Sequence, residues 1–211
     1  MRIYSFEKLP STQRWLIEKI GEKAVEPPCA VITEWQTDGI GSRENRWIGR
    51  PGNFFASLAL HEAHLPDDLP LPSASIYFAF LMKTTLKKMG SATWVKWPND
   101  LYVQERKIGG CITMKKGRTV VAGIGLNIVD APLDFGVLDL DVTPMELLEN
   151  FLDSVEEAPS WKQIFSNFRL EFENSKKFHT HEGSETLDLR DAVLQNDGSL
   201  LIGKRRVVSL R

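Results

Sequence analysis

Apolar residues recur along this chain with two periods, and the change from one to the other predicts where strands and helices lie. Short apolar runs bounded by glycine, proline or polar clusters are typical of strands, and they fall at residues 3–6, 29–35, 54–61, 93–95, 101–103, 111–114 and 120–129. Longer segments with apolar residues three and four positions apart predict helices, at residues 11–21, 73–90, 143–157 and 159–176. Strands and helices therefore alternate over most of the chain.

The pattern changes after the last helix. Four short strand-like runs follow, at residues 178–181, 186–194, 199–202 and 206–210, and residues 195–199 read as a hairpin turn between two of them. Strands grouped after helices indicate a separate unit. We therefore divide the chain into residues 1–177 and 178–211, and expect the second part to be a small β-barrel-like domain.

The composition narrows the class of protein. The 26 Lys and Arg against 28 Asp and Glu leave a net charge of −2, which argues against a nucleic-acid binder because no basic stripe neutralises phosphates. No apolar signal segment stands at the N-terminus, and no window approaches about 18 apolar residues, so we expect a cytoplasmic protein with no membrane partner. Cys29 and Cys111 lie in apolar runs, which predicts buried free thiols.

The richest chemistry lies in residues 96–110. Pro98 cannot donate a ladder hydrogen bond, so the strand before it should stop there, and Asn99 and Asp100 follow at the strand end. A second short strand, at residues 101–103, then leads to a polar turn, a pair of cations that includes Lys107, and two glycines. A carboxylate, an amide and a lysine in one place suit a Mg-nucleotide and an anionic substrate, although the same residues also read as a hairpin with a charged turn.

Ser11, Thr12 and Gln13 stand at the start of the first helix. Ser or Thr at such a position usually caps the backbone N–H groups of the first turn. The same hydroxyls and the Gln13 amide are also suited to bind a small polar ligand at the helix N-terminus. The two roles are compatible.

Two further segments combine glycine with polar residues. Residues 36–47 form a loop with two glycines and two arginines, which suits phosphate binding but is also typical of a surface turn. Residues 123–127 place two glycines at alternate positions in a strand, which predicts a bulge or a close backbone approach. Asn127 in this apolar strand needs hydrogen-bond partners, which are either structural groups or a ligand.

Four segments, in this order, resemble those of biotin protein ligases. They are Ser11-Thr12-Gln13, the loop at residues 36–47, K-W-P-N-D with R-K-I-G-G between residues 96 and 110, and G-I-G-L-N at residues 123–127. The combination of K-W-P-N-D and R-K-I-G-G is specific, and the other segments support it. The resemblance extends over residues 3–129, whereas the C-terminal strands are similar to the SH3-like domain of the family only in position and character.

The resemblance implies an α+β fold, in which a mixed sheet backed by helices carries the active site. This is the class II synthetase-like fold of biotin and lipoate ligases, followed by a small SH3-like β-barrel. It also implies a reaction in two steps. The carboxylate of biotin attacks the α-phosphate of Mg-ATP to give biotinyl-5′-AMP and pyrophosphate, and a lysine of a biotin carboxyl carrier protein then displaces AMP.

The same resemblance assigns roles to single residues. The implied biotin-binding residues are Ser11, Thr12, Gln13, Gln36, Ile40, Gly41, Ser42, Lys107 and Gly110. The implied ATP-binding residues are Arg43, Arg46, Trp47, Asn99, Asp100 and Asn127, with Asp100 as the carboxylate for Mg²⁺. Lys107 and Arg43 are the implied catalytic residues. Lys107 would hold the biotin carboxylate and the reacting phosphate together.

The loop at residues 36–47 departs from the family pattern G-R-G-R-x-G-R. It reads G-I-G-S-R-E-N at residues 39–45, so two arginines are absent and Glu44 replaces a glycine. We therefore expect this protein to hold biotinyl-5′-AMP more weakly than relatives with the full loop do. A dissociation rate as slow as theirs would contradict this expectation.

Two alternatives to a biotin protein ligase stay open at this point. Lipoate ligases share the fold, so lipoate or another acyl group is an alternative substrate, and the altered loop also suits a non-enzymatic biotin-binding module. Some relatives carry a DNA-binding domain before the catalytic one. Ser11 stands too near the N-terminus to leave room for it, so we expect no DNA binding. The oligomeric state is undecided, with a homodimer as one alternative.

Overall fold

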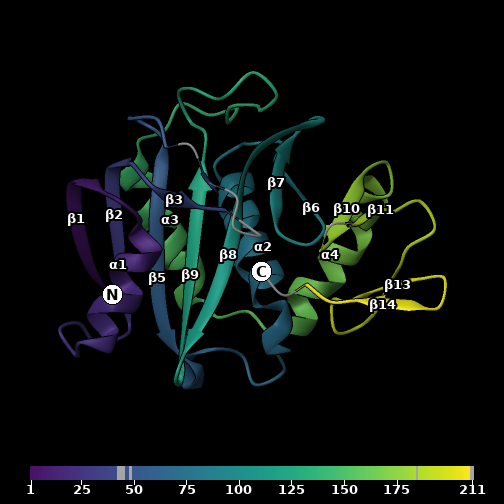
Figure 1. The fold of residues 1–211 in the computed structure, drawn as a ribbon, viewed down its shortest axis with the longest axis horizontal. Helices are drawn as coiled ribbons and strands as arrows, with labels where there is room; N and C mark the ends of the chain where they lie inside the picture. The colour runs from purple at the N-terminus through teal and green to yellow at the C-terminus, as the bar shows by residue number, and fades with distance from the viewer. Residues whose placement is uncertain (42–45, 48, 184, 210–211) are drawn as a thin grey trace.

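The computed structural model describes residues 1–41, 46–47, 49–183 and 185–209. A seven-stranded sheet with the strand order β1–β2–β5–β9–β8–β7–β6 forms its centre (Figure 1). These strands are β1 (Arg2–Leu9), β2 (Cys29–Gln36), β5 (Phe54–His61), β6 (Trp94–Lys96), β7 (Asp100–Val103), β8 (Arg106–Lys116) and β9 (Thr119–Leu126). β1 and β2 are parallel and the other neighbouring pairs are antiparallel, so the predicted mixed sheet is confirmed.

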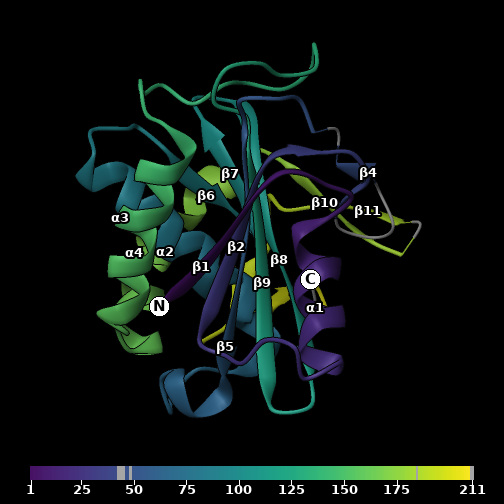
Figure 2. The ribbon, with the colours of Figure 1, turned by 90° about the vertical axis from the view of Figure 1, so that its left-hand side faces the viewer.

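Helices cover both faces of this sheet (Figure 2). On one face lies α1 (Thr12–Gly21), and on the other lie α2 (Ala74–Lys88), α3 (Pro144–Glu156) and α4 (Trp161–Ser175). Two short 3₁₀ helices, η2 (Glu62–His64) and η3 (Leu71–Ser73), connect β5 to α2. All four helices that the apolar spacing predicts are present, with ends within about two residues of the prediction.

Helix starts follow the capping signals in the sequence. The Ser11 hydroxyl accepts the backbone N–H of Arg14 at 3.4 Å at the start of α1. The Thr143 hydroxyl accepts the N–H of Glu146 at 3.2 Å, directly before a proline in the first turn of α3. At α4, Ser160 and its third neighbour form a reciprocal capping box, which satisfies backbone donors that a helix start leaves free.

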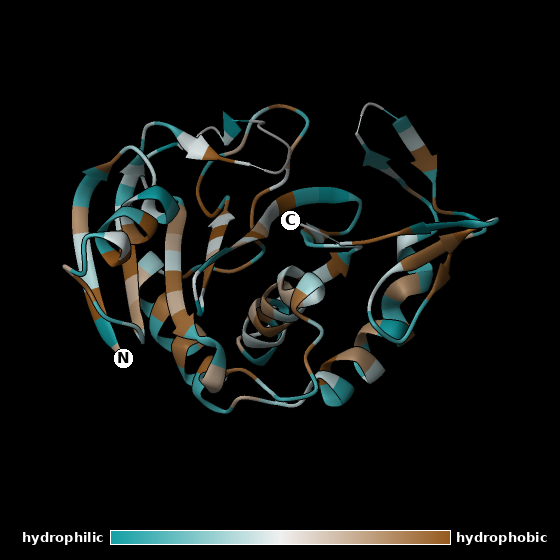
Figure 3. Ribbon diagram, turned by 60° about the horizontal axis from the view of Figure 1, so that its bottom comes forward, coloured by the Kyte–Doolittle hydropathy of each residue, from teal (hydrophilic) through white to brown (hydrophobic). Residues whose placement is uncertain are grey.

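Two apolar clusters fill the space between the sheet and its helices. The larger lies on the side of α2, α3 and α4 and includes the fully buried Phe78, Trp97 and Phe168. The smaller lies under α1 around Leu16 and Cys29. Figure 3 shows the apolar residues concentrated along the central strands and on the helices. Both cysteines are buried and free, as predicted.

Residues 106–110 differ from the prediction. The two cations and two glycines were expected to precede the strand at residues 111–114, but they belong to β8. The physical reason is the close packing of two strands. A side chain on Gly109 would place its Cβ 2.2 Å from the carbonyl oxygen of Gly125 in β9, so glycine here fits the sheet rather than ending it. The predicted close approach at residues 123–127 is thereby confirmed.

The C-terminal segment forms two small antiparallel sheets. One pairs β10 (His179–Glu182) with β11 (Glu185–Asp188), and the other contains β12 (Val193–Leu194), β13 (Leu200–Ile202) and β14 (Arg205–Val207). The single strand predicted at residues 186–194 is instead two strands, because the chain turns inward to bury Leu189 between them. The closed barrel and the division at residue 177 stay predictions.

Two short strands, β3 (Gly39–Ile40) and β4 (Arg46–Trp47), pair antiparallel within the segment predicted as a loop at residues 36–47.

In the described part of the chain, no helix is both long and apolar enough to cross a membrane.

Candidate active site

A pocket opens where the start of α1 meets β8, β9 and the turn between β6 and β7. Its empty space, including the part open to solvent, is about 500 Å³. Segments far apart in the sequence contribute its walls. The predicted residues that line it are Ser11, Thr12, Gln13, Gln36, Ile40, Gly41, Trp47, Asn99, Asp100, Lys107 and Gly110. The structure therefore brings most of the predicted site to one place.

One part of the pocket wall is a preorganised set of polar groups. The side-chain carbonyl of Gln36 accepts both the backbone N–H of Thr12, at 2.9 Å, and its hydroxyl, at 3.1 Å. The Thr12 hydroxyl also lies 2.8 Å from the hydroxyl of Ser57 on β5. Because all three residues are at most 7% exposed, these bonds hold the polar wall in one geometry.

Two buried polar atoms in this wall have no hydrogen-bond partner in the described part of the chain. They are Oε1 of Gln13 and the indole Nε1 of Trp47. The Gln13 amide nitrogen does donate to the carbonyl of Ile112, at 3.4 Å, so only one end of its amide is unmatched. An unmatched acceptor and an unmatched donor inside one pocket indicate a ligand that offers both kinds of group.

Two strand glycines make room for these groups. A Cβ on Gly123 would lie 3.3 Å from Cδ of Gln13, and a Cβ on Gly125 would lie 2.9 Å from Nε1 of Trp47. The side chains of α1 and β4 can therefore approach the backbone of β9. Replacement of either glycine by a larger residue would displace the side chain of Gln13 or Trp47, which carries the unmatched polar atom.

The pocket wall also contains a charged pair. The carboxylate of Asp100 lies 2.6 Å from Nζ of Lys107 through one oxygen and 3.6 Å from Nζ of Lys96 through the other. Burial alone would raise the pKa of Asp100, but the charges and hydrogen bonds of Lys107 and Lys96 outweigh it and hold the pKa below its usual range. Asp100 is therefore ionised at neutral pH, and Lys107 is the partner lysine that lines the pocket with it.

The turn directly before Asp100 is fixed to β8. The backbone carbonyl of Asn99 accepts the N–H of Cys111 at 3.0 Å, and its side-chain amide donates to the carbonyl of the same residue. A Cβ on Gly110 would lie 3.1 Å from the Asn99 carbonyl oxygen and 3.4 Å from Oδ1 of Asp100. Glycine at this position therefore allows the turn to pack closely against β8.

Four of the predicted residues are not shown at this pocket. Arg46 is exposed, does not line it, and pairs with Asp38 at 3.4 Å. Asn127 is 1% exposed and donates to the carbonyl of Gly136 at 3.2 Å, so the structural partner left open by the sequence is present. Its contact with a nucleotide stays a prediction. Ser42 and Arg43 lie outside the described residues.

The sequence did not assign a binding role to every residue of the pocket wall. The further lining residues are Ser57, Cys111, Ile112, Gly123, Ile124 and Gly125, of which the last three lie in the G-I-G-L-N segment. A signal for Ser57 exists in the sequence, because it is a lone hydroxyl in an otherwise apolar strand. Burial raises the pKa of the Cys111 thiol, which keeps it protonated and unreactive as a nucleophile.

Comparison with protein families and curated proteins identifies relatives for part of the chain. The model of the biotin/lipoate A/B protein ligase family matches residues 5–128. The bifunctional ligase/repressor BirA of Escherichia coli (strain K12) is 32% identical over 127 residues, which are 57% of this chain and 38% of that protein. The biotin--[acetyl-CoA-carboxylase] ligase of Paracoccus denitrificans is 29% identical over 125 residues, 54% of this chain and 50% of that protein. The chain therefore spans half or less of the length of these relatives.

Solved structures are similar over the whole chain. The biotin acetyl coenzyme A carboxylase synthetase of Helicobacter pylori, with bound biotinylated ATP, is 37% identical, with a TM-score of 0.94, over 98% of this chain and 99% of that one. The biotin protein ligase of Aquifex aeolicus, in complex with biotin and ATP, is 20% identical, with a TM-score of 0.72, over 100% and 96% of the two chains. At that lower identity the similarity concerns the fold.

Proposed function

The chain belongs to the biotin/lipoate A/B protein ligase family, and on this premise we propose that it is an ATP-dependent biotin protein ligase. The observation that carries the proposal is that one pocket combines two kinds of groups. It is lined by residues with an unmatched hydrogen-bond donor and an unmatched acceptor, and also by the Asp100–Lys107 ion pair. Biotin offers partners for both, because it carries a ureido ring and a carboxylate.

The polar part of the pocket wall supplies the hydrogen-bond donors and acceptors that a ureido ring requires. Its carbonyl oxygen is an acceptor and its two N–H groups are donors, so burial requires partners of both kinds. Oε1 of Gln13 is the free acceptor, and the hydroxyls of Ser11, Thr12 and Ser57 line the same wall. Because their hydrogen bonds fix these groups before binding, little conformational entropy is lost when the ligand enters.

The charged pair would bring two anions together. In the first step the biotin carboxylate oxygen bonds to the α-phosphorus of ATP while the bond to the β-phosphate breaks and pyrophosphate leaves. The Lys107 ammonium would neutralise both anions and the charge that develops between them. In the second step a lysine amine of a biotin carboxyl carrier protein attacks the activated carbonyl, an amide forms, and AMP leaves. The carrier is proposed because the Paracoccus relative is named for acetyl-CoA carboxylase.

A magnesium ion would enter with ATP. Within the described residues, no group of three or more His, Cys, Asp or Glu could hold a metal ion by itself. Mg²⁺ is usually bound through one or two carboxylates together with substrate phosphates, and the pocket offers Asp100. The bound ion would neutralise phosphate charge.

The test is ATP–pyrophosphate exchange with biotin and, separately, with lipoate. We expect exchange that depends on biotin, and a loss of about 10²–10³-fold in Lys107→Gln because a cation at the developing charge is removed. The matched control is Lys116→Gln, an exposed lysine at the far end of the same strand, which should keep the wild-type rate.

The other outcomes assign the alternatives. Exchange that depends on lipoate and not on biotin would identify a lipoate ligase. Biotin binding without any exchange would identify a non-enzymatic biotin-binding module. An unchanged rate in Lys107→Gln would remove this lysine from the mechanism.

A further inference from the structure

We infer that the C-terminal turn at residues 195–199 positions the Asn99–Asp100 end of the pocket, with Trp97 as the positioning residue between them. The inference rests on the proposed function, because it concerns the geometry in which Asp100 and Lys107 meet the nucleotide. It adds a role for a segment outside residues 5–128, the part of the chain that the family model matches.

The β6–β7 turn is unusual in being buried. Connections between strands normally run over the surface, where water satisfies their backbone groups. Here Trp97 is 0% exposed and Asn99 is 4% exposed. A cover must therefore lie over the turn, and the C-terminal turn is in contact with it.

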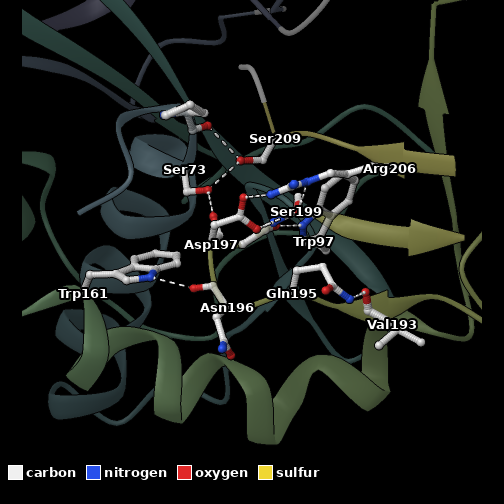
Figure 4. A network of polar contacts seen from close by, with 12 residues as sticks. Ser73, Trp97, Trp161, Val193, Gln195, Asn196, Asp197, Ser199, Arg206 and Ser209 are labelled. Carbon is white, nitrogen blue, oxygen red and sulfur yellow. Dashed lines mark hydrogen bonds and ion pairs between the residues drawn. The ribbon is translucent and has the colours of Figure 1, made fainter. Parts of the chain in front are cut away.

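Trp97 donates hydrogen bonds from its side chain and from its backbone to elements in the C-terminal third of the chain. Its indole N–H donates to the carbonyl of Gly198 at 2.8 Å. Figure 4 shows Trp97 beside Asp197 and Ser199, the neighbours of Gly198 in the turn. The backbone N–H of Trp97 donates to the hydroxyl of Ser175, at the end of α4, at 3.0 Å. Both bonds are buried, so an acceptor that moved away would leave an unmatched donor.

The covering turn is itself locked in place. The Asp197 carboxylate accepts the backbone N–H and the hydroxyl of Ser199, at 3.1 and 2.7 Å, and pairs with Arg206. Gly198 has φ of +84°, and a Cβ there would lie 2.6 Å from the hydroxyl of Ser73 at the start of α2. The carbonyl offered to Trp97 is therefore presented by a backbone that has little freedom to shift.

A shift of Trp97 would reach the site within three residues. Asn99 is bonded to Cys111 on β8, and Asp100 is bonded to Lys107 on the same strand. The turn thus lies between β8 on one side and the C-terminal turn on the other. Loss of the outer contact would let Asp100 move relative to Lys107, and a displacement of about 1 Å in a catalytic group can cost about 10²-fold in rate.

The same turn offers a matched control. The indole N–H of Trp161 donates to the carbonyl of Asn196 at 3.0 Å, and Trp161 is 5% exposed (Figure 4). Trp161 begins α4 and does not line the pocket. The two tryptophans therefore have the same chemistry, similar burial and the same partner segment, and only Trp97 leads to the site.

The experiment compares Trp97→Phe with Trp161→Phe at a temperature where both variants are fully folded. We expect kcat/KM for ATP in biotin-dependent exchange to fall at least about 10-fold in Trp97→Phe and to stay within about twofold of wild type in Trp161→Phe. The Kd of biotin, measured by calorimetry, should stay within about twofold in both, because its polar wall is built by other elements. Backbone amide resonances of Asn99, Asp100 and Lys107 should shift in Trp97→Phe alone.

Equal effects of the two substitutions on kcat/KM, or an equal loss of biotin affinity and ATP use, would show a merely structural role and overturn the inference. If Trp97→Phe does not fold, Gly198→Ala replaces it, since this change displaces the acceptor carbonyl and leaves Trp97 intact; it should give the same loss. Wild-type protein without exchange would contradict the proposed function, and the amide resonances would still decide the inference.

Discussion

At the scale of single residues, the Asp100 carboxylate forms ion pairs with two lysines, Lys96 and Lys107. The side chains of Asp100 and Lys96 are only 18% and 9% exposed, so neither charge is well solvated by water alone. A buried ion pair adds little compared with apolar residues of the same shape, but removal of one partner is costly because the other charge is left unmatched. The trio is therefore a constraint on geometry more than a source of stability.

Asp100→Asn should lower the free energy of unfolding at pH 7 by about 3 kcal/mol, because two ammonium groups lose their counter-charge. The folded-state pKa of Asp100 is lowered, so its stabilising effect is complete above the unfolded-state value of about 3.9 and is lost as the pH falls through the lower folded-state pKa. Urea unfolding from pH 7 down to pH 3 should show a constant difference from wild type above about pH 5, and a shrinking one below about pH 4.

The matched control for this prediction is Asp130→Asn. Arg50 lowers the pKa of Asp130 through an exposed ion pair, which water and salt screen. We expect a much smaller loss than in Asp100→Asn. A difference that is as large for the exposed pair, or one that does not change with pH, would contradict the role of burial.

At the scale of elements, a single asparagine shapes the chain that leaves β9. Asn53 is fully buried, and its side-chain oxygen accepts the backbone N–H groups of Ile128 and Val129, each at 2.9 Å, and of Asp130 at 3.3 Å. Its amide nitrogen donates to the carbonyl of Asp130 at 2.7 Å. The segment at residues 128–130 thus takes its hydrogen bonds from a side chain before β5 rather than from a neighbouring strand.

Asn53→Ala should lower the free energy of unfolding by about 1–3 kcal/mol, because buried backbone donors lose their acceptor. Amide hydrogen exchange should become faster at residues 128–130 and stay unchanged in the middle of β9. The control Asn150→Ala removes an exposed side chain that donates to the Glu146 carbonyl at 2.8 Å, and should change stability little. Unchanged exchange at residues 128–130 would show that the loop holds itself in place.

At the scale of the whole molecule, the C-terminal strands share the core of the main sheet. Leu189, Ala192, Leu200 and Val207 belong to the same buried cluster as the residues of α2 and β8. An independent domain would bury its apolar residues against one another and unfold by itself. The shared cluster indicates that the C-terminal segment and the main sheet unfold together.

Leu200→Ala should destabilise the whole chain by about 2–5 kcal/mol, because Leu200 is 0% exposed and the change leaves a cavity. Its neighbour Leu201 is 37% exposed, so Leu201→Ala is the control and should have a small effect. Tryptophan fluorescence and far-UV circular dichroism should report one coincident transition in urea. An early, separate transition in Leu200→Ala would instead indicate an independent C-terminal domain.

Features that depend on near neighbours in the chain follow from the amino-acid sequence by itself. Apolar spacing and capping residues such as Ser11 and Thr143 set the four helices, because helix hydrogen bonds and caps join residues only three or four positions apart. The same local pattern is misleading at residues 106–110, where glycines that are typical of a turn serve the packing of β8 on β9. The local pattern also predicts one strand at residues 186–194, where the structure has β11 and β12. It does not show that the chain turns between them to bury Leu189.

The pocket depends on contacts that no local pattern contains. Family resemblance indicates most of its residues, but the bond from Thr12 to Gln36 spans 24 positions, and the one from Gln13 to Ile112 spans 99. Asn127 illustrates the limit, since the sequence shows only that its amide needs partners, and the fold supplies the carbonyl of Gly136. Periodicity and caps are short-range properties of the backbone, whereas a binding site is formed by side chains that meet only when the sheet and helices pack.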